Sequence, residues 1–143
     1  MTGRRRPALR ARCGCGPAAA PRACRLSLSA RPGVVAECRA FTRAVLADDV
    51  PGGAVDDAVL LVSELVTNAC RYSAEAGSLL LVRGPGVLRV EVSDSSPLPP
   101  TPHRPHHPDR PGGLGLHLVD RLARCWGWRR QGPGKVVWFE LPM

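Results

Sequence analysis

The sequence predicts an α/β (α+β) fold, a two-layer sandwich in which three helices cover one face of a mostly antiparallel mixed sheet. Three segments carry apolar residues at intervals of three to four, which is typical of amphipathic helices. Five short segments are apolar or alternate polar with apolar residues, as strands do. Gly-Pro-Gly turns at 84–86 and 132–134 join four of these strands into two hairpins, whose strands are antiparallel. Helices that bury one apolar stripe against such a sheet complete the sandwich.

The first half of the chain predicts one strand followed by two helices. Arg25–Ser29 alternates polar and apolar residues and is the first expected strand. Helices are expected over about 33–47 and 54–72, separated by the turn sequence Pro51-Gly52-Gly53. The second helix has the clearest pattern in the chain, because its apolar stripe comprises Val55, Val59, Val62, Val66 and Ala69.

The second half predicts two hairpins separated by a loop and a helix. Residues 97–111 contain seven of the fifteen prolines, a density that no helix or central strand tolerates, so we expect a long loop there. A third helix is expected from Gly112 onward. The expected hairpin strands lie at 78–83, 87–93, 125–130 and 136–141.

The net charge of +8 is confined to the N-terminal segment. Residues 1–31 contain eight arginines and no acidic residue, whereas residues 32–143 contain 12 basic and 12 acidic groups. Residues 1–23 lack periodicity and contain several Gly and Pro, so we expect a disordered basic tail before a single domain at 24–143. A function in nucleic-acid binding would therefore depend on the tail, and nucleic acid is not an expected partner of the domain.

Nothing in the sequence indicates a membrane span or a secretory signal. The longest aliphatic runs have four residues, far fewer than the roughly 20 that cross a bilayer. No apolar stretch follows the basic N-terminus. The six cysteines include no Cys-x-x-Cys pair, so we expect free thiols rather than a zinc site. We therefore expect a cytoplasmic protein with no membrane partner.

Three polar or glycine-rich positions are candidates for chemistry. Glu64 and Asn68 lie four residues apart on the second helix, so their side chains project from one face and could serve as a general base and a Mg²⁺ ligand. Asp94 ends a strand, where its carboxylate could accept a hydrogen bond from an exocyclic amine. The glycines at 112–115 open a helix, where free N–H groups could bind a phosphate. Each has an ordinary alternative: a solvated helix face, a turn carboxylate and a glycine-dependent helix entry.

Taken together, these segments resemble the Bergerat-type ATP-binding domain that gyrase and the sensor histidine kinases share. More narrowly, the chain resembles the bacterial anti-sigma-factor family of serine/threonine kinases. Residues 63–69 are similar to the N box of that family, 90–97 to the G1 box and 113–116 to the G2 box. Residues 134–141 resemble its closing strand, so the resemblance extends over about residues 24–142.

The resemblance implies a role for each candidate residue. Glu64 would be the catalytic base that activates the attacking hydroxyl or water. Asn68 would ligate the Mg²⁺ that bridges the phosphates, and Asp94 would bind the adenine amino group of ATP. The 97–111 loop would cover the nucleotide as a lid. The phosphates would lie against the backbone of the G2 box, which comprises Gly113, Leu114, Gly115 and Leu116.

The chain departs from the family pattern around the G1 box and the closing strand. Ser96 and Leu98 occupy positions where many relatives carry glycine, which concerns the mobility of the lid more than adenine binding. Lys135 stands near the position of a threonine in many relatives.

Three functions remain open at this stage. The first is a Mg-ATP-dependent serine/threonine protein kinase acting as an anti-sigma factor, whose protein partner is a sigma factor or an anti-sigma-factor antagonist. The second is a catalytically weak ATP-binding module that sequesters a protein partner. The third is a nucleic-acid binder that uses the arginine tail. Relatives in this family commonly dimerise, so the resemblance also allows a homodimer.

Overall fold

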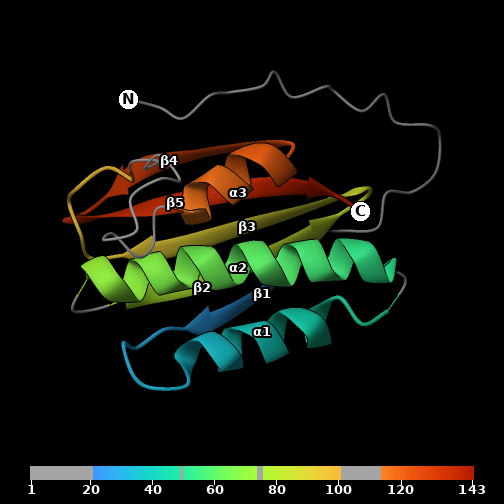
Figure 1. Ribbon diagram of the computed structural model, residues 1–143, viewed down its shortest axis with the longest axis horizontal. Coiled ribbons are helices and arrows are strands. Elements are labelled where there is room, and N and C mark those ends of the chain that lie inside the picture. The colour runs from blue at the N-terminus through green and yellow to red at the C-terminus, as the bar shows by residue number, and fades with distance from the viewer. Residues whose placement is uncertain (1–20, 49, 74–75, 101–113) are drawn as a thin grey trace.

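The structure is a computed structural model, and it describes residues 21–48, 50–73, 76–100 and 114–143. Three helices lie on one face of a five-stranded sheet (Figure 1). The α/β two-layer fold predicted from the sequence is therefore confirmed. In chain order the elements are β1 (Arg22–Ser27), α1 (Val34–Val45), α2 (Gly52–Tyr72), β2 (Ala76–Gly84), β3 (Val87–Asp94), α3 (Leu114–Leu122), β4 (Cys125–Gln131) and β5 (Gly134–Pro142).

The sheet is antiparallel throughout, with the strand order β1-β2-β3-β5-β4. The two strands of the last hairpin are reversed relative to their chain order, so that β5 lies beside β3 and β4 lies at the edge of the sheet. This arrangement brings the end of β3 next to the beginning of β5, where Asp94 lies opposite Lys135. The sheet topology thus places two residues side by side that are 41 positions apart in the sequence.

The core lies between the sheet and the helices. Along β3, buried Leu88, Val90 and Val92 alternate with partly exposed residues, which is the pattern of a strand with one covered face. The predicted stripe of α2 packs onto this face, because Val59, Val62, Val66 and Ala69 are all buried. Each fully buried Val or Leu contributes about 1.5–3 kcal/mol of transfer free energy. Apolar packing of α2 on the centre of the sheet is therefore what holds the helix layer in place.

The observed boundaries differ most from the predicted ones at β1. This strand begins at Arg22, three residues before the prediction, and ends at Ser27. In the sequence, Arg22, Ala23 and Cys24 do not alternate polar with apolar residues, but they pair with β2 through their backbone. The proposed boundary between tail and domain at 23/24 therefore falls inside β1. Residues 1–20 and the lid portion at 101–113 lie outside the described residues.

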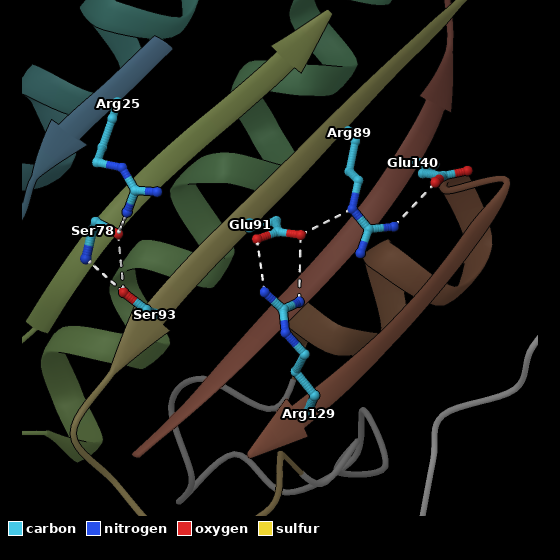
Figure 2. A network of polar contacts seen from close by, with 7 residues as sticks. All are labelled: Arg25, Ser78, Arg89, Glu91, Ser93, Arg129 and Glu140. Carbon is cyan, nitrogen blue, oxygen red and sulfur yellow. Dashed lines mark hydrogen bonds and ion pairs between the residues drawn. The ribbon is translucent and has the colours of Figure 1, made fainter. Parts of the chain in front are cut away.

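The uncovered face of the sheet carries a network of ion pairs around Glu91 (Figure 2). The Glu91 carboxylate accepts hydrogen bonds from Arg89 Nε at 3.0 Å and from Arg129 Nη2 at 3.1 Å, and Arg89 Nη1 also reaches Glu140 Oε1 at 3.1 Å. The Arg89 guanidinium lies over the Trp138 ring, 4.1 Å from its centroid. These contacts join β3, β4 and β5 across their solvent side.

This network stabilises the ionised form of Glu91. Burial opposes ionisation, but the hydrogen bonds from Arg129 and Arg89 outweigh it, so the pKa of Glu91 lies below its usual value. A carboxyl group with a lowered pKa in the folded state stabilises the protein above its unfolded pKa of about 4.3 and loses that contribution as the pH falls further.

Glu91→Gln should therefore flatten the acid side of the stability profile. The variant should be less stable than the parent at pH 7, and the difference should shrink as the pH falls below about 4.3. Urea denaturation between pH 3 and pH 7 measures this. Asp57→Asn is the matched control, because Asp57 is an exposed carboxylate on α2. A constant difference between Glu91→Gln and the parent at all pH values would contradict the assignment.

Candidate functional site

The N-terminus of α3 packs against the polar face of α2. A Cβ atom added to Gly115 would lie 3.1 Å from Glu64 Oε2 and 3.2 Å from Asn68 Nδ2. The backbone of Gly115 therefore lies directly beside both side chains, and a larger residue would displace them. The structure thus brings together three of the candidate residues from two separate segments of the sequence.

Asn68 contains an unsatisfied buried acceptor. Within the described part of the chain, its Oδ1 atom is buried and has no hydrogen-bond partner. An orphaned buried polar group costs about 1–3 kcal/mol, so such an atom is retained where a ligand supplies its partner. An amide oxygen is one of the hard ligands that Mg²⁺ accepts. Asn68 therefore fits a metal ligand, with Glu64 one helical turn away.

The described residues provide no complete metal cage of their own at this position. Across the described residues, no group of three or more His, Cys, Asp or Glu side chains could hold a metal ion. Mg²⁺ usually keeps several waters and binds through one or two protein groups together with substrate phosphates. A single amide ligand beside a phosphate-binding backbone is consistent with that mode of binding.

Asp94 forms the second part of the site, at the end of β3. It is 9% exposed, and its Oδ1 atom accepts two hydrogen bonds, from the Ser96 backbone N–H at 2.8 Å and from Lys135 Nζ at 2.9 Å. Lys135 is itself only 6% exposed, so the two charges form a buried ion pair. Sequence reasoning identified Asp94 but treated Lys135 only as a departure from the family pattern.

Gly134 explains how β5 approaches Asp94 so closely. A Cβ atom at this position would lie 1.9 Å from the Asp94 carbonyl oxygen, so only glycine can be accommodated without moving the strand. Lys135 follows Gly134 directly, so the strand register that Gly134 permits places Lys135 opposite Asp94.

A serine pair joins the two parts of the site. Ser73, just beyond α2, accepts a hydrogen bond from the Ser95 backbone N–H at 3.0 Å, and the hydroxyls of the two serines are also hydrogen-bonded. The end of the helix that carries Glu64 and Asn68 is thereby attached to the residue after Asp94. Figure 1 shows the end of α2, the end of β3 and the start of β5 at the same end of the molecule. Neither serine was singled out from the sequence: Ser73 lies in no motif, and Ser95 lies in the G1 box without a role of its own.

The remaining candidates belong to the G2 box. Gly115 is buried, and the side chain of Leu116 is 4% exposed and belongs to the apolar core, so Leu116 can offer a ligand only its backbone. Leu114 is the first residue of α3. Gly113 lies outside the described residues.

Comparison with known proteins identifies the domain. The sequence model of the histidine kinase-like ATPase domain matches residues 28–141, a range that contains all the candidate residues. The chain belongs to the histidine kinase-like ATPase domain family. Membership in this ATPase family implies ATP binding, and it confirms the resemblance that the N, G1 and G2 boxes indicated.

Two solved structures are similar to this domain. The crystal structure of the RsbU and RsbW domains of Rv1364c from Mycobacterium tuberculosis matches at 18% identity with a TM-score of 0.64, covering 85% of this chain and 32% of that one. The chain therefore spans about a third of that protein, and the likeness concerns the fold. The catalytic domain of the histidine kinase ThkA matches at 15% identity with a TM-score of 0.49, covering 85% of this chain and 95% of that one. No curated protein matches the chain significantly.

The described helices of this ATPase domain do not include a membrane span. Among the described residues, no helix is both long and apolar enough to cross a bilayer.

Removing one partner of the buried ion pair should strongly destabilise the ATPase domain. Asp94→Asn leaves the Lys135 ammonium buried without its counter-charge, which typically costs about 3–5 kcal/mol. The double variant Asp94→Asn/Lys135→Met removes both charges and should regain part of that loss. Urea denaturation of the single and double variants measures the effect. Additive losses in the double variant would show that the two side chains do not interact.

Proposed function

We propose that this chain is a Mg-ATP-dependent serine/threonine protein kinase that acts as an anti-sigma factor on a protein partner. The observation that carries the proposal is the close approach of the Gly115 backbone, near the N-terminus of α3, to the side chains of Glu64 and Asn68. Glu64 is a possible base, and the buried Oδ1 of Asn68 has no hydrogen-bond partner among the described residues. These are the parts that phosphoryl transfer needs, because catalysis of this reaction is mostly positioning and charge neutralisation.

The Glu64 carboxylate would accept the proton of the attacking serine or threonine hydroxyl. Asn68 Oδ1 would bind Mg²⁺, which, when present, neutralises charge on the phosphates. The first backbone N–H groups of α3 have no partner within the helix, so they would donate to phosphate oxygens. Asp94 would accept from the adenine amino group and fix the other end of the nucleotide. Gly115 matters because a side chain there would occupy the space that separates α3 from Glu64 and Asn68.

The protein partner would be a sigma factor or an anti-sigma-factor antagonist. Support for this part of the proposal comes from the narrower resemblance of the motifs and from a fold like that of a structure that contains an RsbW domain. Phosphorylation of an antagonist would then control which partner the domain holds.

A second candidate is an ATP-binding module with weak catalysis that holds its partner. Ser96 favours this second candidate, because the residue is 5% exposed and both its N–H and its hydroxyl form hydrogen bonds within its own turn. Its N–H donates to Asp94 Oδ1 at 2.8 Å, and its Oγ accepts from the Leu98 N–H at 3.3 Å. The segment after Asp94 is thereby held at a position where relatives place a more flexible glycine.

Titration with Mg-ATP should raise the melting temperature of the parent protein, because a ligand that binds only the folded state adds about 2.7 kcal/mol at 100 times its Kd. The shift should be smaller for Asn68→Ala, and EDTA should remove the difference between this variant and the parent. Scanning fluorimetry measures it. A parent protein that shows no shift at millimolar Mg-ATP would contradict the proposed site.

Glu64→Gln separates the two candidate functions. For a kinase, this variant should keep the thermal shift but lose about 100- to 10,000-fold in transfer of the γ-phosphate to a purified anti-sigma-factor antagonist. Asp57→Asn, on an exposed position of the same helix, is the control and should retain activity. If the parent binds ATP but transfers no phosphate to any antagonist tested, the binding-module alternative is favoured.

A further inference from the structure

The hydroxyl of Ser73 connects two parts of the chain that are 22 positions apart. Ser73 directly follows α2, where the backbone becomes extended, and it is 7% exposed. Its Oγ atom accepts the Ser95 N–H at 3.0 Å, and the two hydroxyls are hydrogen-bonded to each other. The hydroxyls of Ser63 and Thr42 donate instead to carbonyls one turn earlier in their own helices. The Ser73 hydroxyl therefore bonds across the fold, to the residue that follows Asp94.

The peptide between Asp94 and Ser95 is contacted from two sides. On one side, the β5 backbone lies so close that a Cβ atom on Gly134 would be 1.9 Å from the Asp94 carbonyl oxygen and 3.0 Å from Ser95 Cα. On the other side, Ser73 accepts the Ser95 N–H. Apolar packing of α2 on the sheet is non-directional, whereas a hydrogen bond sets the distance between two particular atoms. Ser73 therefore fixes the position of this peptide relative to the end of α2.

The separation that this contact sets is the one that the proposed nucleotide must span. Asn68 lies five residues before Ser73, which corresponds to about 7.5 Å along a helix. In the proposed site, Asn68 holds the phosphate end through Mg²⁺ and Asp94 holds the base. A ligand that binds at both ends gains affinity when the two ends of its site are kept at the separation it needs.

We propose that Ser73 is a positioning residue, which couples the phosphate end of the nucleotide site to the base end. This inference rests on the proposed function, because it takes Asn68 and Asp94 as the two ends of the ATP site. Ser73 acts through Ser95 and has no assigned contact with the nucleotide. It lies outside the N, G1 and G2 boxes, so this role is additional to those that the motifs imply.

The test separates binding of the whole nucleotide from binding of its parts. The probes are ATP, adenosine, which carries only the base end, and tripolyphosphate, which carries only the phosphate end. Each is titrated with Mg²⁺ into the full chain and followed by NMR. Ser73→Ala should bind ATP about 3- to 30-fold more weakly than the parent, the range expected for the loss of one or two hydrogen bonds. Its affinities for adenosine and for tripolyphosphate should stay within about twofold of the parent values, because each end remains intact.

Ser93→Ala is the matched control. Ser93 Oγ makes the same two kinds of contact, because it accepts the Ser78 N–H at 2.8 Å and bonds to the Ser78 hydroxyl at 3.1 Å. These bonds join β2 to β3 on the uncovered face of the sheet (Figure 2). This variant should bind all three ligands as the parent does. Equal losses of ATP affinity in Ser73→Ala and Ser93→Ala would overturn the inference, because they would reflect a general weakening of the sheet.

Two further variants complete the design. Ser73→Thr keeps the hydroxyl and should restore at least part of the affinity for ATP. If Ser73→Ala is unfolded by circular dichroism, Ser95→Ala takes its place, because Ser95 is exposed. This change removes the contact between the hydroxyls and keeps the backbone bond, so ATP should bind about 2- to 10-fold more weakly.

The outcomes distinguish this inference from the proposed function. If the parent binds ATP and the folded alanine variant binds it equally well, Ser73 does not couple the two ends. Equal losses for ATP, adenosine and tripolyphosphate would overturn the inference too, because they would reflect damage to the site as a whole. A parent protein that binds none of the three ligands would contradict the proposed ATP site, and the inference with it.

Discussion

The pairing of β3 with β5 is the constraint on which the proposed base site depends. It places Asp94 opposite Lys135 and converts two charged residues into a buried ion pair with Nζ and Oδ1 2.9 Å apart. Gly134 makes this approach feasible, because any side chain there would collide with the Asp94 carbonyl. A buried pair is costly to desolvate, and its value for stability alone is small or negative relative to apolar residues. The proposed function gives the pair another role, because Asp94 would bind the base of the nucleotide there.

The second half of the site follows from helix packing. The apolar stripe of α2 docks on the sheet, which turns the opposite edge of the helix, with Glu64 and Asn68, toward the beginning of α3. Gly115 allows α3 to approach until its backbone lies beside the side chains of Glu64 and Asn68. The Ser73–Ser95 contact then links this half to the segment after Asp94. The phosphate end and the base end of the proposed site are thus connected by the packing of the same helix.

The parts of this arrangement that depend on local sequence were predictable. Periodicity located all three helices and both hairpins, because the alternation of apolar and polar side chains within one element can be seen in neighbouring residues of the sequence. The spacing of Glu64 and Asn68 placed them on one face, because a helix repeats every 3.6 residues. The beginning of β1 was missed by three residues, because Arg22, Ala23 and Cys24 do not alternate polar with apolar residues in the sequence, although they pair with β2.

The contacts made across the sheet were not predictable. Lys135 contacts Asp94 only because β5, and not β4, pairs with β3. The order of strands in a sheet cannot be derived from the local pattern of a single sequence. The hydrogen bond of Ser96 to Asp94 is local, but it became interpretable only once the carboxylate was known to be buried. Family motifs thus marked the candidate residues, whereas the geometry showed which partners they have.

The most direct test of the account is an amide NMR map of the full chain with a non-hydrolysable ATP analogue and Mg²⁺. The account predicts that the largest shift changes fall on Gly115, Ser96 and Lys135, which come from three separate elements of the sequence, while Arg89 and Trp138 on the uncovered face remain unchanged. Changes confined to the uncovered face, with none at these three residues, would contradict the location of the site.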